Sequence, residues 1–320
     1  MLDEKLSMTQ TWLKGMIWIG AGVSAAVVVL RLWLLPAVAD WQTGMFASNY
    51  WVIGFMVAAL IALAALRYLA GPFRREIHGP AAVVMAIAAL FTGAVLAVMS
   101  VLELFRILGG GVVLFDGSEE SATSLLSILE HGFGVLGGAA LIRFGWALLT
   151  EGATRRGIAQ WSILAPVLWA LVRLVGYEMS YASMVRIEDN FFGFIMLIVE
   201  LLFLFRLARF ASGIGRVSAG SLMGHAMATA IFAISGPVTR VGMYLLQDHQ
   251  AFAAYQLAGP TDLTIGVFAL VVGIALLSGE DIGVQEDSLS EVLDKDAAEA
   301  VDVASADLLF NPVADDETAE

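Results

Sequence analysis

Long apolar runs alternate with short polar connections along most of this chain. Eight stretches hold about 20 or more mostly apolar residues each, the length that an α-helix needs to cross the hydrocarbon core of a bilayer. Hydropathy places these stretches near residues 13–38, 50–70, 80–108, 123–149, 160–184, 190–211, 219–246 and 258–278. The pattern therefore predicts an all-α, polytopic transmembrane helical bundle with eight spans.

The composition supports this class. Hydrophobic residues make up 59% of the chain and charged residues 15%, which leaves too little polar surface for a soluble globule of 320 residues. Cysteine is absent from the sequence, which excludes disulfides and thiolate metal ligands. The first apolar stretch is of full length and lacks a small-residue cleavage site, so we expect it to stay attached to the protein.

Charge divides the chain into a transmembrane domain, 1–279, and an acidic tail, 280–320. The tail holds 14 of the 30 acidic residues and one basic residue, Lys295, whereas the two signs balance in the rest of the chain. Such a composition predicts a largely disordered segment. The short apolar cluster at 308–310 leaves two interpretations open, a solvated tail or a docking segment for a cytosolic partner.

Basic residues in the short connections predict the orientation. Arginines follow the second, fourth and sixth spans, whereas the opposite connections are mostly acidic. Cytoplasmic loops are enriched in Lys and Arg, so we expect a multi-pass protein of the cell membrane with both termini in the cytoplasm.

The two halves of the domain share a weak pattern. When Arg31 is aligned with Arg173, Arg67 falls on Arg209 and Gly71 on Gly213 at the same offset. This predicts two parallel four-helix repeats, 13–150 and 159–279. The competing interpretation is that arginines recur at cytoplasmic helix ends because the orientation rule requires them there.

Ionisable residues inside the spans are the main functional signal. In a bilayer core such charges are costly, and they usually face a protein interior, a polar cavity or a pathway. Placed by depth, one group predicts an outward-facing pocket for ligand binding or proton coupling: Arg31, Glu103, Arg106, Glu130, Arg173 and Asp262, with Tyr177 adding a hydroxyl. A second group is placed deeper, where it would continue a path: Arg143, Glu200 and His225.

Two interpretations of these charges stay open. Acids and arginines are equal in number near the outer side, so they could neutralise one another as interhelical ties without a ligand. Alternatively they form a working site. Glu103 and Arg106 are three residues apart and share a helix face, so they can pair with each other. Glu130 and His131 point about 100° apart on a helix, so direct cooperation between them is not expected.

Small residues and prolines predict how the spans pack. Gly134 and Gly138 form a pair that lets another helix approach closely, which places the fourth span at the centre of the bundle or at a dimer interface. Pro237, three residues before Arg240, predicts a kink that lines a cavity.

Known catalytic and nucleotide-binding motifs are absent from the sequence, and the four histidines are too scattered to propose a metal site. An enzyme therefore ranks last, and no cofactor and no nucleic acid is expected. The sequence favours a transporter or ligand-binding membrane protein that meets the lipid bilayer and a small-molecule or ion ligand. The alternative is a noncatalytic scaffold or accessory subunit whose tail recruits a cytosolic partner. Homo-oligomerisation is left open.

Overall fold

The computed structural model describes residues 22–23, 25–29, 75–76, 79–109, 125–150, 162–181, 187–212, 219–246, 259–278 and 280–281. The second predicted span, most of the first span and nearly all of the acidic tail lie outside these residues, and so does Arg31. The described part of the first span is helical.

Six predicted apolar stretches are helices, with bounds within a few residues of those expected. They are α3 (Pro80–Leu108), α4 (Leu125–Thr150), α5 (Ala165–Tyr181), α6 (Ile187–Ala211), α7 (Ala219–Leu246) and α9 (Pro260–Ser278). A short 3-10 turn, η1 (Ser162–Leu164), precedes α5. Among the described residues, extended backbone occurs only in two strands of two residues, β1 (Arg75–Glu76) and β2 (Glu280–Asp281). The described part is thus helical, while the eight spans and the repeat stay predictions.

Within the described part of the chain, three helical segments are long and apolar enough to cross a membrane: α3, α4 and residues 221–239 of α7. The apolar parts of α5 and α9 are shorter, and α6 carries charged residues within its apolar sequence. The outer faces of α3 and α4 expose large apolar side chains, among them Phe91, Phe105 and Trp146. These features are consistent with a membrane protein, in which lipid covers such faces.

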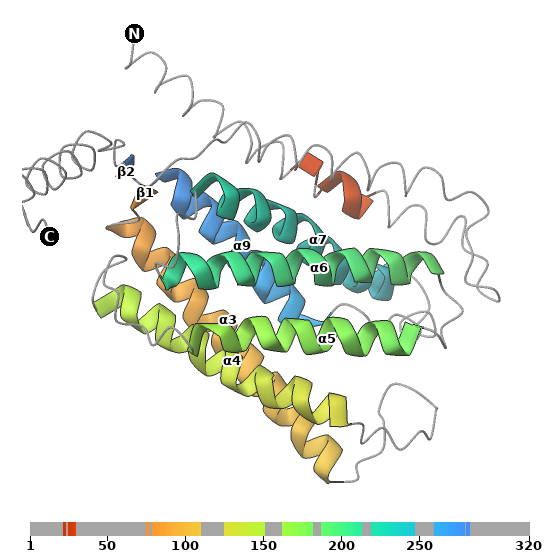
Figure 1. Cartoon of the computed structure of the whole chain (residues 1–320). Coiled ribbons are helices and arrows are strands. Elements are labelled where there is room, and N and C mark those ends of the chain that lie inside the picture. The colour runs from red at the N-terminus through yellow and green to blue at the C-terminus, as the bar shows by residue number, and fades with distance from the viewer. Residues whose placement is uncertain are drawn as a thin grey trace, which may run out of the picture. The chain divides into compact units, whose positions relative to one another are not determined.

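The six helices close into a ring. Each packs against the next described helix along the chain, and α9 packs against both α7 and α3 (Figure 1). A hydrogen bond from the Thr92 hydroxyl to the Thr264 carbonyl, 3.1 Å long, links α3 to α9 at this closing contact. Helices α5 and α9 are not packing neighbours in the ring. A contact between these two helices therefore has to come from long side chains.

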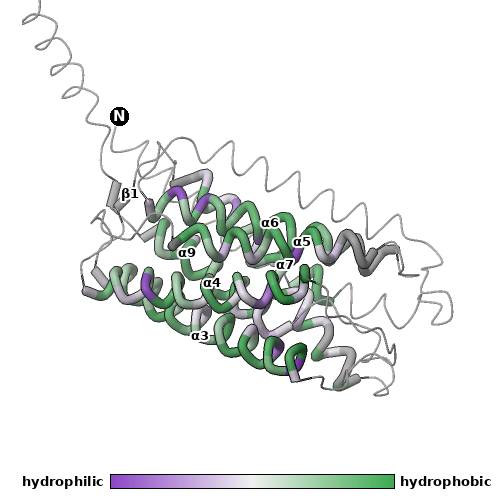
Figure 2. The backbone as a smooth tube through the Cα atoms, turned by 60° about the horizontal axis from the view of Figure 1, so that its bottom comes forward, coloured by the Kyte–Doolittle hydropathy of each residue, from purple (hydrophilic) through white to green (hydrophobic). Residues whose placement is uncertain are grey.

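Aromatic and aliphatic side chains fill the space between α6, α7 and α9. The rings of Phe203 and Phe268 meet edge to face with centroids 5.8 Å apart, and those of Phe192 and Phe232 lie 5.4 Å apart. Figure 2 shows that the helices are hydrophobic along most of their length, with hydrophilic positions as isolated interruptions. The few charged residues inside this bundle therefore stand in apolar surroundings.

Glycines bring α3 and α4 into backbone contact. A Cβ atom on Gly138 would lie 2.5 Å from the carbonyl oxygen of Gly93, and one on Gly145 would lie 2.7 Å from that of Ala86. Gly134 faces Ser100 of α3 and Trp169 of α5. The predicted close approach at Gly134 and Gly138 thus occurs within this chain. Helix α4 has an exposed face, so it lies at the edge of the described bundle rather than at its centre.

Pro237 lies inside α7, and the helix continues past it to Leu246. Proline has no N–H, so the carbonyl of Ala233, one turn earlier, loses its usual helical partner. Gly266 of α9 packs at this turn, since a Cβ atom there would lie 3.0 Å from the Ala233 carbonyl carbon. The expected kink at Pro237 stays a prediction.

Candidate functional site

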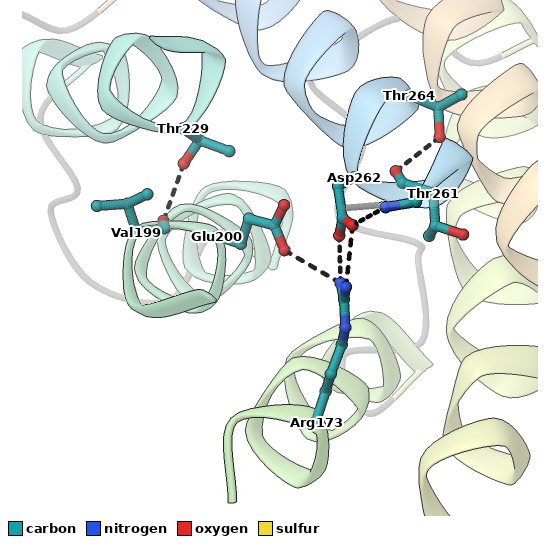
Figure 3. A network of polar contacts seen from close by, with 8 residues as sticks. Arg173, Val199, Glu200, Thr229, Thr261, Asp262 and Thr264 are labelled. Carbon is teal, nitrogen blue, oxygen red and sulfur yellow. Dashed lines mark hydrogen bonds and ion pairs between the residues drawn. The ribbon is translucent and has the colours of Figure 1, made fainter. Parts of the chain in front are cut away.

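Arg173 of α5 and Asp262 of α9 form a partly buried, bidentate ion pair. Nη1 of Arg173 donates to Oδ1 of Asp262, and Nη2 donates to Oδ2 at 2.9 Å (Figure 3). Asp262 is fully buried, and the Arg173 side chain is 18% exposed. Paired hydrogen bonds between a guanidinium and a carboxylate are among the strongest in proteins. The pair joins two helices that are not neighbours in the ring.

The backbone of α9 also holds Asp262 in place. Asp262 is the third residue of the helix, and its Oδ2 accepts the N–H of Gly259 at 2.7 Å. A carboxylate at this position reaches back to the start of the helix as in a capping box, and it lies at the positive end of the helix dipole. The Asp262 carboxylate therefore has three donors, two from Arg173 and one from Gly259.

Glu200 of α6 is a second acid on the same guanidinium. Its Oε2 lies 3.5 Å from Nη1 of Arg173, and its side chain is 1% exposed. Within the described part of the chain, neither carboxylate oxygen of Glu200 has a hydrogen-bond partner. Two buried acids thus contact one partly buried base, and of the two acids Asp262 is the one that accepts hydrogen bonds.

Interhelical hydroxyl bonds anchor the backbone beside both acids. The Thr229 hydroxyl of α7 donates to the carbonyl of Val199, the residue before Glu200, at 2.9 Å. The Thr92 bond reaches α9 at Thr264, two residues after Asp262. Such bonds fix the relative position of helices in a membrane bundle. Figure 3 shows both acids together with Thr229 and Thr264.

The surroundings of Arg173 on α5 are aromatic and largely buried. The Arg173 Cζ atom lies 5.3 Å from the ring centroid of buried Trp169, one turn earlier, which is within the range of a cation–π contact. Tyr177, one turn later, is also buried.

Glu130 of α4 lies beside the same stretch of α5. A Cβ atom on Gly176 would lie 4.0 Å from Oε2 of Glu130, and the Glu130 charge acts on Arg173. Glu130 is only partly buried. It therefore belongs to the edge of the cluster, as a third acid near a single arginine.

The other predicted site residues divide into two groups. Glu103 and Arg106 pair with each other, as their spacing predicts, with Nε and Oε2 2.9 Å apart and side chains 33% and 38% exposed. Among the described residues, no ion pair joins them to Arg173, Asp262 or Glu200. Arg31 lies outside the described residues.

Sequence reasoning missed the role of Glu200. We expected it deeper in the bundle, on a path toward the cytoplasm, but it contacts Arg173 directly. One signal pointed to it, because Glu200 is the only acid in the apolar stretch 190–211. The described residues contain no group of three or more His, Cys, Asp or Glu side chains that could hold a metal ion.

Comparison with known proteins identifies no relative of this chain. No protein-family model, no curated protein and no solved structure matches this chain. The helices and the buried cluster therefore carry the functional argument alone.

Proposed function

We propose that this protein is a multi-pass membrane transporter for a small solute or ion. In this proposal Arg173, Asp262 and Glu200 form the site whose ion pairing changes during transport. These three residues are called the Arg173 cluster below. The observation that carries the proposal is that two buried carboxylates on different helices contact one guanidinium. Ionisable groups kept inside an apolar bundle are expensive, and they usually mark a pathway or a coupling site.

Because Asp262 and Glu200 compete for Arg173, the bundle has two possible arrangements. With Arg173 on Asp262, the ion pair ties α5 to α9 across the ring. With Arg173 on Glu200, the tie runs from α5 to α6, which are packing neighbours. A transporter needs two states of similar free energy that a ligand can bias. Exchange of Arg173 between the two acids is the switch that we propose.

The remaining predicted site residues are assigned to the outer part of the pathway. Arg31, Glu103, Arg106, Glu130 and Tyr177 would line the entrance on the side opposite the termini. In this proposal the protein has eight spans with both termini in the cytoplasm.

A second candidate function rests on the same contacts. The bidentate bond between Arg173 and Asp262 satisfies both groups without any ligand, as an interhelical tie in a scaffold or accessory subunit would. In that case the acidic tail would recruit a cytosolic partner.

Currents from reconstituted protein separate the two functions. The full chain in proteoliposomes, adsorbed on a solid-supported membrane, is exposed in turn to a carboxylate, an amino acid, an amine, phosphate and sodium. We expect a saturable transient current with one of these classes and its loss in Asp262→Asn. The control variant Glu76→Gln, in the short strand β1, should keep the current. The absence of a current with all five solutes, together with failed assembly of the Arg173→Ala variant, would favour the scaffold or accessory-subunit function.

A further inference from the structure

With both of its acids ionised, the Arg173 cluster would carry one more negative charge than positive charge. Arginine keeps its proton under all conditions met in proteins, so Arg173 contributes one positive charge. Asp262 and Glu200 would contribute two negative charges when both are ionised. Glu200 is repelled by Asp262 and attracted by Arg173. An uncompensated charge in a dry interior is unfavourable, so the surplus needs a counterion.

The charges that act on Glu200 within the described residues do not include a second base. Helix α9 carries Asp262 as its single charged residue, and α4 presents a further acid, Glu130. On α7, Nδ1 of His225 bonds the carbonyl of Ser221 on its own helix at 2.7 Å. Among the described residues, the charges that act on Glu200 are those of Asp262 and Arg173.

From this geometry we infer that Glu200 is a proton-binding site and that the proton is the coupling ion of the transporter, which rests on the function proposed above. The two acids differ in hydrogen bonding. Asp262 accepts three hydrogen bonds, two from Arg173 and one from Gly259. Glu200 accepts none among the described residues, so the proton goes to Glu200. With that proton bound, the Arg173 cluster is neutral.

Proton binding to Glu200 would then determine whether Arg173 ties α5 to α9 or α5 to α6. Protonated Glu200 has no charge with which to attract Arg173, and its new O–H can donate to the carboxylate of Asp262. Arg173 then stays on Asp262 and joins α5 to α9. When the proton leaves, the Glu200 carboxylate competes for Nη1 and pulls Arg173 toward α6. One proton is taken up and released per cycle; Arg173 exchanges hydrogen bonds between the two acids, and no covalent bond other than the O–H bond of Glu200 is made or broken.

A monovalent cation held between the two carboxylates is the alternative counterion. Cations of this kind need several oxygen ligands, whereas a carboxyl group takes up a proton alone. The described part of the chain contains no group of three or more His, Cys, Asp or Glu side chains that could hold a metal ion. This favours the proton.

Infrared difference spectroscopy of the reconstituted full chain tests the proton site without reference to transport. Between low and high pH, we expect a C=O stretching band of a protonated, buried carboxyl group. Glu200→Gln, an isosteric mimic of the protonated acid, should remove this band and leave folding intact. The matched variant Glu130→Gln, at the partly buried edge, should keep it. A band that persists in Glu200→Gln, or one that responds to sodium at constant pH, would overturn the inference.

Transport and protonation can fail separately. If Glu200→Gln removes the band but the wild type moves none of the five solutes, the proton site stands and the transporter proposal fails. If the wild type moves a solute and Glu200→Gln retains the full response to a pH gradient, Glu200 is not the coupling site.

Discussion

Arg173 and Asp262 connect two helices, α5 and α9, that are not packing neighbours in the ring of six described helices. The bond therefore crosses the ring instead of strengthening an existing helix interface. Glu200 contacts the same guanidinium from α6, so any movement of Arg173 changes which pair of helices is tied.

Loss of the arginine should destabilise the protein more than loss of the whole cluster. Arg173→Ala leaves two buried acids without a base, and breaking a buried ion pair in this way typically costs about 3–5 kcal/mol. Combining it with Asp262→Asn and Glu200→Gln removes the stranded charges. We expect Tm in detergent to fall sharply in Arg173→Ala and to recover in large part in the triple variant. Equal Tm values for the two variants would show that the charges are not buried together.

Backbone contact between α3 and α4 leaves no room for a side chain at Gly138. In Gly138→Ala the new methyl group would lie 2.5 Å from the Gly93 carbonyl oxygen, so the helices must move apart. Overpacking of this kind costs about 1–3 kcal/mol. Gly132→Ala, on the same helix, is the matched control, because its Cβ atom would meet nothing within 4 Å. Thermal unfolding should show a drop for the first variant and none for the second.

The hydroxyl of Thr229 should contribute measurably to the contact between α6 and α7. Thr229→Val keeps the shape of the side chain and removes the bond to the Val199 carbonyl. Interhelical bonds in membrane bundles average about 0.6 kcal/mol. Thr150→Val is the control, since that exposed hydroxyl bonds the Trp146 carbonyl of its own helix. A denaturant titration that gives equal midpoints for both variants would contradict the role of Thr229.

The predicted orientation can be read directly, because the chain contains no cysteine. Single cysteines in place of Ser118 and Ala153 fall in the connections after the third and fourth predicted spans. With both termini in the cytoplasm, a membrane-impermeant maleimide should label Ser118→Cys in intact cells. It should label Ala153→Cys only after the membrane is opened. The reverse pattern would invert the orientation.

Much of the helical organisation could be predicted from hydropathy alone. Six apolar stretches became helices, and the pairing of Glu103 with Arg106 followed from their spacing on one helix. Both features depend on residues close in sequence, and local periodicity reports on those. Arg173 and Asp262 were predicted to share a site for a different reason. Charges inside an apolar bundle are costly and usually face a common polar interior, and the estimated depth of these two residues placed them in one group.

The sequence by itself determined which segments are apolar helices and which charges interrupt them. Only the tertiary structure decided that Glu200 shares Arg173 with Asp262, and that among the described residues no ion pair joins Glu103 or Arg106 to these three. Depth along a helix can be estimated from sequence, but the direction a residue faces depends on how the helices cross. Contacts between residues 27 or 89 positions apart are set by that packing, which hydropathy does not contain.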